Sequence, residues 1–174
     1  MVQLNLRTRI KQDNTVGSRL NIEQAYIAGF LDGDGSLMLQ IKKRADGRLK
    51  YRFMGTICFY QDSRHEAPLS WIRNILGIGY LTKRNDGMSE LRINGFKQVR
   101  DILAMLLPFI RFKKDQALAL HKATGLLTRK PHKLLSQRDL RLLVDHICVI
   151  QNANYASRRK KTKKELLEML GLTP

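Results

Sequence analysis

The sequence predicts an α+β protein of one domain, or two small ones at most, in which a helix and two antiparallel strands occur twice. The chain has 174 residues, 43% of them hydrophobic, which is enough for a proper core. Residues 21–33 form an apolar segment of helical character. Residues 35–60 then alternate between apolar and polar side chains around an Asp-Gly pair, and residues 63–94 repeat the helix and hairpin.

The first helix is expected to begin after Asn21, a good N-cap residue that together with Gln24 resembles a capping box. Its end is expected near Asp32 or Gly33. No side chain between Gln24 and Asp32 is polar, so the helix is predicted to be buried on all sides.

Small residues recur along this helix at intervals of four, at Ala25, Gly29 and Gly33, and so form one stripe. A glycine costs about 1 kcal/mol relative to alanine in a helix interior, so a compensating interaction is expected. Small residues let a second backbone approach closely, and the chain has only one helix of this kind. We therefore expect Ala25, Gly29 and Gly33 to form a homodimer interface around a two-fold axis.

The first hairpin is predicted to have one apolar and one polar face. The apolar positions alternate on both sides of the Asp46-Gly47 turn, at Leu37, Leu39, Ile41, Tyr51, Phe53, Ile57 and Phe59. The side chains of the other face are polar and mostly basic: Gln40, Lys42, Arg44, Arg52 and Thr56. A merely solvated face usually mixes charges of both signs, so this pattern favours a binding surface.

Further helices are predicted over residues 63–76, 96–109, 113–129, 136–153 and 165–170. The first of these is expected to start near Pro68, because proline is tolerated in the first turn of a helix, and to end at Gly77. A second hairpin over residues 80–94 places Thr82, Arg84 and Arg92 on its polar face.

The composition is strongly basic: 32 Lys and Arg residues oppose 15 Asp and Glu, giving a net charge of +17. Since basic residues recur along the chain, a polyanion is the expected partner, with nucleic acid favoured over an acidic membrane surface. No apolar run approaches the ~18 residues of a membrane span, so no membrane insertion is expected. Cys58 and Cys148 form no CxxC pair, which indicates free thiols in a reducing, intracellular compartment.

Three regions are expected along the chain. Residues 1–20 are a basic N-terminal arm, with a weak transit peptide as the alternative. Residues 21–155 are the core. Residues 156–174 are a basic segment with a short helix, and its sequence "SRRKKTKK" is either a clamp for a polyanion backbone or a solvated linker.

The segment Asp32-Gly33-Asp34-Gly35 places two carboxylates at the C-terminal end of the first helix. A carboxylate there faces the negative end of the helix dipole, and a polyanion nearby is also unfavourable. Both penalties shrink if a divalent cation lies between carboxylate and phosphate, and Mg²⁺ takes one or two carboxylates plus phosphate oxygens. A simple Asp-Gly turn is the alternative interpretation.

The stretch "AYIAGFLDGDGS" (25–36) resembles the signature of the LAGLIDADG homing endonucleases, and is most similar to the single-motif, homodimeric enzymes encoded in algal organellar introns. Weaker matches are "GIGYL" (77–81) and "PFIRFKKDQA" (108–117). The resemblance implies an αββαββα fold with additional C-terminal helices and a four-stranded antiparallel saddle that binds the DNA major groove. It also implies a chloroplast or other organellar location.

The family resemblance further implies Mg²⁺-dependent cleavage of both strands of a long, pseudo-palindromic DNA target across the minor groove, with Mn²⁺ or Ca²⁺ able to replace Mg²⁺ in binding. Asp34 matches the metal-binding aspartate and Gly33 a carbonyl ligand. Asp32 is expected to be structural. The other catalytic positions are Gln61, which would orient water, Lys113 near the scissile phosphate, and a second basic residue for which Arg64 and His65 both fit.

On this resemblance, the outward residues of the saddle are the expected DNA contacts: Gln40, Lys42, Arg44, Arg48, Arg52, Thr56, Thr82, Arg84 and Arg92. Two other functions stay open at this point. The same fold serves as an intron RNA maturase, and a DNA-binding regulator could have kept the scaffold without the nuclease.

Overall fold

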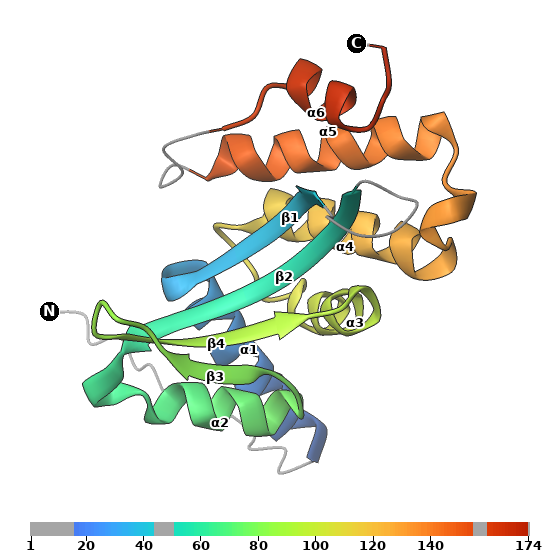
Figure 1. Ribbon diagram of the computed structural model, residues 1–174. Coiled ribbons are helices and arrows are strands. Elements are labelled where there is room, and N and C mark those ends of the chain that lie inside the picture. Colours follow the sequence, from blue (N-terminus) through green and yellow to red (C-terminus); the bar gives the residue numbers. More distant parts are fainter. Residues whose placement is uncertain (1–15, 44–50, 155–159, 174) are drawn as a thin grey trace, which may run out of the picture.

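A computed structural model of the chain describes residues 16–43, 51–154 and 160–173. The predicted α+β architecture is confirmed (Figure 1). The strands are β1 (Gly35–Lys43), β2 (Tyr51–Asp62), β3 (Tyr80–Lys83) and β4 (Met88–Asn94). The helices are α1 (Val16–Asp34), α2 (Ala67–Leu76), α3 (Phe96–Leu106), α4 (Lys114–Arg129), α5 (Gln137–Ala153) and α6 (Lys163–Met169), with 3₁₀ turns η1 (Ser63–His65) and η2 (His132–Leu134).

The four strands form one antiparallel sheet in the order β1-β2-β4-β3. Its core face is the one that the hydrophobic alternation predicts, since Leu37, Leu39, Phe53, Ile57 and Phe59 are all at most 5% exposed. Buried side chains of α1, α3 and α4 pack against that face, and α5 and α6 follow at the β1 end of the molecule (Figure 1). The opposite face carries mostly polar side chains, with Met38, Met54 and Cys58 among them.

Helix α1 begins at Val16, five residues before Asn21, so Asn21 is not its N-cap. Each residue added to an existing helix gains a backbone hydrogen bond, whereas a cap stabilises only the end at which it lies. The capping pattern at Asn21 and Gln24 is therefore outweighed by continuation of the helix.

The prediction that α1 is buried on all sides is wrong for a single chain. Ile27, Ala28 and Leu31 are fully buried, but Ile22 is 66% and Tyr26 is 56% exposed. Gln24, the polar residue, is nearly buried. An all-apolar sequence has no periodicity that distinguishes a covered face from an uncovered one, and one chain covers only the face toward the sheet and α3.

No loop separates α1 from β1, because the helix ends at Asp34 and the strand starts at Gly35. A Cβ at Gly35 would lie 2.7 Å from the carbonyl oxygen of Leu31 and 2.5 Å from its Cδ1, which no side chain tolerates. Gly35 thus allows the chain to turn directly over the last turn of the helix. This turn places Asp34 at the edge of the sheet.

The other predicted elements are confirmed with small shifts. Helix α2 has Pro68 in its first turn and ends at Gly77, whose φ of +67° is the left-handed conformation expected of a C-cap glycine. The segment before it, Ser63–His65, is a separate 3₁₀ turn and not the start of the helix. The Asp46-Gly47 turn lies outside the described residues.

The C-terminal segment is attached to the core by α6. Thr162 and Glu165 form a capping box at the start of α6. Leu166, Leu167 and Leu170 are buried and belong to the same hydrophobic cluster as the sheet. Within the described part of the chain, no helix has both the length and the hydrophobicity to cross a bilayer.

Candidate functional site

Asp32 joins the end of α1 to the turn before α4. Its Oδ2 accepts hydrogen bonds from the backbone N–H groups of Arg111 at 2.6 Å and Phe112 at 3.2 Å, and its Oδ1 accepts one from Lys113 at 2.9 Å. Three donors in succession just before a helix N-terminus form a favourable environment for a negative charge. These bonds give Asp32 the structural role that the family resemblance implied.

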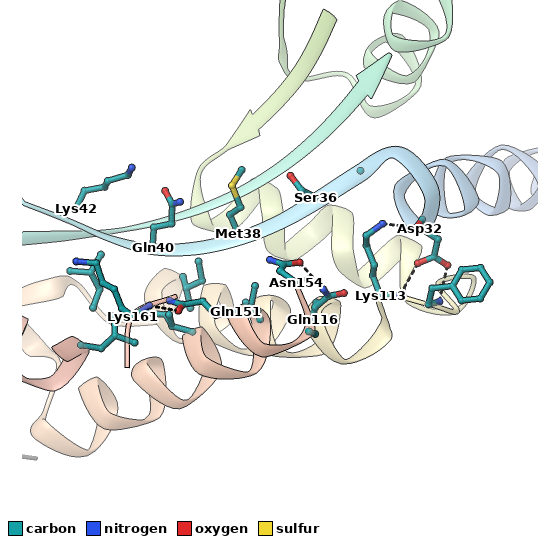
Figure 2. A pocket seen from close by; sticks show the side chains of 18 of the residues that line it. Asp32, Ser36, Met38, Gln40, Lys42, Lys113, Gln116, Gln151, Asn154 and Lys161 are labelled. Carbon is teal, nitrogen blue, oxygen red and sulfur yellow. Dashed lines mark hydrogen bonds between the residues drawn. The ribbon is translucent and has the colours of Figure 1, made fainter. Parts of the chain in front are cut away.

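Lys113 is the last residue of this turn and the N-cap residue of α4. Its Nζ donates hydrogen bonds to the carbonyl oxygens of Leu31 at 3.0 Å, Gly33 at 3.2 Å and Asp32, and so caps the C-terminal end of α1 (Figure 2). Burial lowers the pKa of Lys113 below its ordinary value, although the charges of Asp32 and Asp34 oppose that shift. The ammonium therefore lies beside the segment Asp32-Gly33-Asp34-Gly35, called the DGDG segment below.

Asp34 contrasts with Asp32, because its side chain is exposed and has no hydrogen bond or ion pair with any described residue. It lies beside the Gly33 carbonyl. Nowhere in the described part of the chain do three His, Cys, Asp or Glu side chains come together as a metal cluster. A carboxylate and a carbonyl are hard oxygen donors that suit Mg²⁺, which needs only one or two carboxylates when phosphate oxygens complete its shell. The donor set therefore fits a magnesium ion shared with a phosphate.

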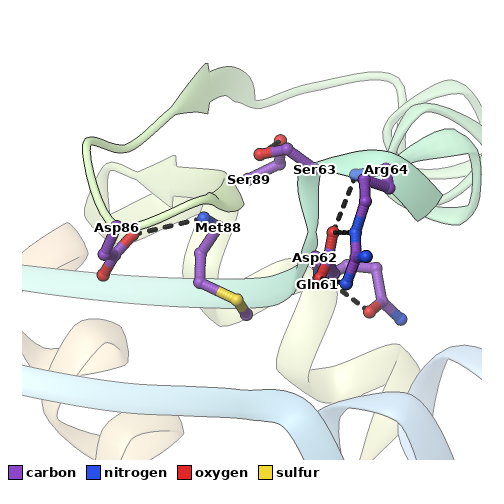
Figure 3. Close-up of polar contacts among 7 residues, drawn as sticks. All are labelled: Gln61, Asp62, Ser63, Arg64, Asp86, Met88 and Ser89. Atoms are coloured by element: carbon purple, nitrogen blue, oxygen red, sulfur yellow. Dashed lines mark hydrogen bonds and ion pairs between the residues drawn. The ribbon is translucent and has the colours of Figure 1, made fainter.

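Gln61 lies at the far end of β2, two residues after Phe59, which pairs with Gly35 at the start of β1. The register therefore brings Gln61 to the end of the sheet at which α1 delivers Gly33 and Asp34. Its Oε1 accepts a hydrogen bond from the backbone N–H of Asp62 at 2.8 Å, which leaves the Nε2 amide group available (Figure 3).

The two candidates for a second basic residue differ in their partners. Arg64 donates to Asp62 from Nε at 3.0 Å and from NH2 at 2.7 Å, and these bonds hold the pKa of the Asp62 carboxyl well below its usual range (Figure 3). His65 is exposed and makes no hydrogen bond with the described residues. Both residues fitted the sequence equally well, because the Asp62–Arg64 pairing depends on the local 3₁₀ turn.

The polar face of the sheet carries most of the predicted outward residues: Gln40, Lys42, Arg52, Thr82, Arg84 and Arg92. Arg44 and Arg48 lie outside the described residues. Thr56 lies on this face but is fully buried, with its hydroxyl donating to the Asn94 side chain at 2.9 Å. A side chain with no exposed surface cannot contact DNA, so the expectation for Thr56 is corrected to a structural role between β2 and β4.

A groove of about 680 Å³ runs along the outer edge of β1 (Figure 2). Asp32 and Lys113 lie at one end of it, and Gln40 and Lys42 line the strand side. Its other wall comes from α5 and the segment after it, including Gln151, Asn154 and Lys161. The groove thus connects the end of α1 with the basic C-terminal segment.

Glu90 is a further charged residue of this face and was not among the predicted site residues. It lies on the polar face of β4, is only 5% exposed, and accepts a hydrogen bond from Arg92 Nε at 2.5 Å. Desolvation raises its pKa, but the bonds from Arg92 and Cys58 and the nearby guanidinium charges outweigh burial and lower it, so the carboxylate is ionised. The spacing Glu90-x-Arg92 on one strand face was the available signal.

The LAGLIDADG endonuclease family model matches residues 27–118. The chain is 32% identical to the DNA endonuclease I-CvuI of Chlorella vulgaris over 84% of this chain and 91% of the relative. It is 27% identical to the DNA endonuclease I-CreI of Chlamydomonas reinhardtii, over 83% and 88%. The structure of I-CvuI in complex with its target in the presence of Ca has a TM-score of 0.75 at 28% identity, covering 90% of this chain and 99% of that one.

Proposed function

Since the chain belongs to the LAGLIDADG endonuclease family, we propose that it is a homodimeric, Mg²⁺-dependent endonuclease that hydrolyses both strands of a long, pseudo-palindromic DNA target across the minor groove. The observation that carries this proposal is the exposed, unpaired carboxylate of Asp34, held beside the Gly33 carbonyl at the edge of a basic sheet. An Asp34 already bound by a protein cation or by backbone donors would have had fewer acceptor sites left for a metal ion.

The chain supplies distinct groups for the reaction. Asp34 and the Gly33 carbonyl would hold the metal ion, which when bound polarises the phosphate and lowers the pKa of a bound water. The Lys113 ammonium adds positive charge beside the site, and it would have to release one of its three carbonyl partners at the end of α1 to contact the scissile phosphate directly. Gln61 keeps an amide group free to orient a water molecule at the same end of the sheet.

We assign the second basic position to His65. The guanidinium of Arg64 is bound twice by Asp62, whereas His65 is exposed and unpaired among the described residues. To act on a phosphate, Arg64 would first have to leave a carboxylate. His65 interacts with Asp62 only through its charge, and among the described residues it has no hydrogen bond to lose.

DNA would lie across the polar face of the sheet, with its phosphates following the groove beside β1. Lys42 and Lys161 line that groove, so the proposed path carries positive charge at the end away from Asp34. A net charge of +17 supports strong, salt-dependent phosphate binding. The relative I-CvuI has been solved in complex with its DNA target, which supports DNA as the ligand of this chain.

The homodimer rests on α1. No heavy atom of the described residues lies within 4 Å of a Cβ built at Gly29 or Gly33, so nothing in that part of the chain explains why glycine occupies these positions. Ile22 and Tyr26 are exposed on the same helix. A second α1 packed against this surface would account for both features and would bring two Asp34 residues near one axis.

The test is Asp34→Asn, which removes the charge and keeps the shape. A DNA target is first selected from a randomised duplex pool with Ca²⁺ present, and cleavage is then started with Mg²⁺. We expect the variant to bind the selected duplex and to lose cleavage, while Asp101→Asn, which neutralises an exposed acid on α3, cleaves normally. Mg²⁺-dependent cutting by purified Asp34→Asn protein would show that the assigned mechanism is wrong.

The same experiment separates the alternatives. An RNA maturase would bind structured intron RNA tightly and select no duplex DNA. A nuclease-free regulator would select a duplex and leave it intact with Mg²⁺ in the wild-type protein.

A further inference from the structure

An ionised carboxylate lies beneath the exposed side chains of the polar face. Glu90 Oε1 accepts hydrogen bonds from Arg92 Nε at 2.5 Å and from the Cys58 thiol at 3.4 Å. Its Oε2 lies 3.8 Å from Arg84 NH1. A carboxylate that is 5% exposed is costly to bury unless it is paired, so the contacts with Arg92 and Arg84 are required for its presence there.

The contact with Glu90 fixes the direction of Arg92. The bond uses Nε, and the two terminal nitrogens have no partner among the described residues, while the side chain is 45% exposed. A guanidinium is planar, so holding Nε restricts the direction in which the other two nitrogens point. Arg92 therefore presents a free pair of parallel donors above the sheet.

Arg84, the neighbouring arginine on this face, has no such free pair. Its NH2 lies 2.9 Å from Asp86 and its NH1 faces Glu90, and its guanidinium carbon lies 5.7 Å from the centre of the Tyr60 ring. Both terminal nitrogens thus face carboxylates. Of the two arginines that approach Glu90, Arg92 is the one with donors to offer to a ligand.

The ligand chemistry follows from this geometry and from a shallow depression lined by Tyr80, Thr82, Arg84, Glu90 and Arg92. A pair of parallel N–H donors matches the O6 and N7 acceptors of guanine in the major groove. We propose that Glu90 is a positioning residue that orients Arg92 to recognise one guanine in each half of the DNA target. This assignment rests on the proposed function.

Glu90 could instead contact a base directly, but its burial argues against this. A carboxylate can accept a hydrogen bond from the N4 amino group of cytosine. Glu90 is 5% exposed and its Oε1 is already bonded by two donors, so a base would have to displace Arg92 to reach it. Its effect on base preference is therefore expected to pass through Arg92.

The experiment selects duplexes from a randomised pool with Ca²⁺ for the wild type, Glu90→Gln, Arg92→Ala and the double variant. We expect the wild type to prefer guanine at one position per half-site by roughly 5- to 150-fold, and Arg92→Ala to lose that preference. Glu90→Gln should weaken it several-fold. Asp101→Asn also removes one acid with two basic partners, but on the opposite side of the sheet, and should keep the wild-type preference.

The double variant distinguishes positioning from a direct or merely structural effect. If Glu90 acts through Arg92, then Glu90→Gln changes no base preference once Arg92 is alanine. A further loss in the double variant, or an unchanged guanine preference in Arg92→Ala protein that binds DNA, overturns the assignment. Failure of the wild type to select any duplex would instead overturn the proposed function.

Discussion

Replacing Gly29 by alanine tests whether a second helix packs on α1, because the sign of the effect depends on that partner. Within one chain the new methyl group has no neighbour within 4 Å among residues 16–43, 51–154 and 160–173. Alanine is more favourable than glycine in a helix interior by about 1 kcal/mol. A monomeric protein should therefore be stabilised, with Tm raised by about 2–4 °C for a chain of this size.

In a homodimer the prediction reverses. Each protomer adds one methyl group against the facing helix, and overpacking a close contact costs about 1–3 kcal/mol. Two such groups weaken association by at least about 2 kcal/mol, or roughly thirty-fold in Kd. The gain in helix propensity does not offset this loss, because it stabilises the folded monomer and the dimer equally.

Sedimentation velocity and light scattering over a range of protein concentrations measure the outcome. The wild type should have a mass of about 40 kDa, twice the 20.1 kDa of the chain, and Gly29→Leu should be monomeric. Gly125→Ala is the matched control, since a Cβ there lies at least 3.6 Å from its neighbours and should change stability without changing assembly. A Gly29→Ala protein that is more stable, with unchanged assembly, would refute the shared-helix interface.

Three further predictions concern single residues. Asp32→Asn leaves at least one of three backbone N–H donors without an acceptor and should lower Tm by about 4–8 °C in calorimetry; an unchanged Tm would contradict its structural role. His65→Ala should slow single-turnover DNA cleavage more than Arg64→Ala does, and the reverse order would return the second basic position to Arg64. Burial raises the pKa of the Cys58 thiol to about 11. In a Cys148→Ser background, alkylation of Cys58 at pH 8 should therefore be roughly a hundred-fold slower in folded than in unfolded protein. The rate in the folded protein should increase as the pH approaches 11.

The sequence predicted the fold because the local signals agreed with one another. Alternation identified the core face of the sheet, and Pro68 and Gly77 correctly placed the ends of α2. Contacts between distant segments were not predictable in the same way. That Thr56 is covered, and bonded to Asn94, depends on the pairing of β2 with β4, which no local pattern shows.

Charge pairing across the sheet was missed for a related reason. Counting charges predicted a basic face, but the function of that face depends on which arginines are already bound. Glu90 is one acid among many bases in the sequence, and its burial gives it control over Arg92. Glu90 lowers the net positive charge of the protein by one, but by orienting Arg92 it can increase the base selectivity of that arginine.

The two aspartates of the DGDG segment have different roles for a geometric reason. Residues i and i+2 of a helix are separated by about 200° around its axis, so their side chains point in nearly opposite directions. Asp32 faces the turn before α4, where three backbone N–H groups donate to its carboxylate, whereas Asp34 is exposed and has no hydrogen bond or ion pair with the described residues. One helix end can therefore both anchor Lys113 and present a free carboxylate, and neither aspartate can replace the other.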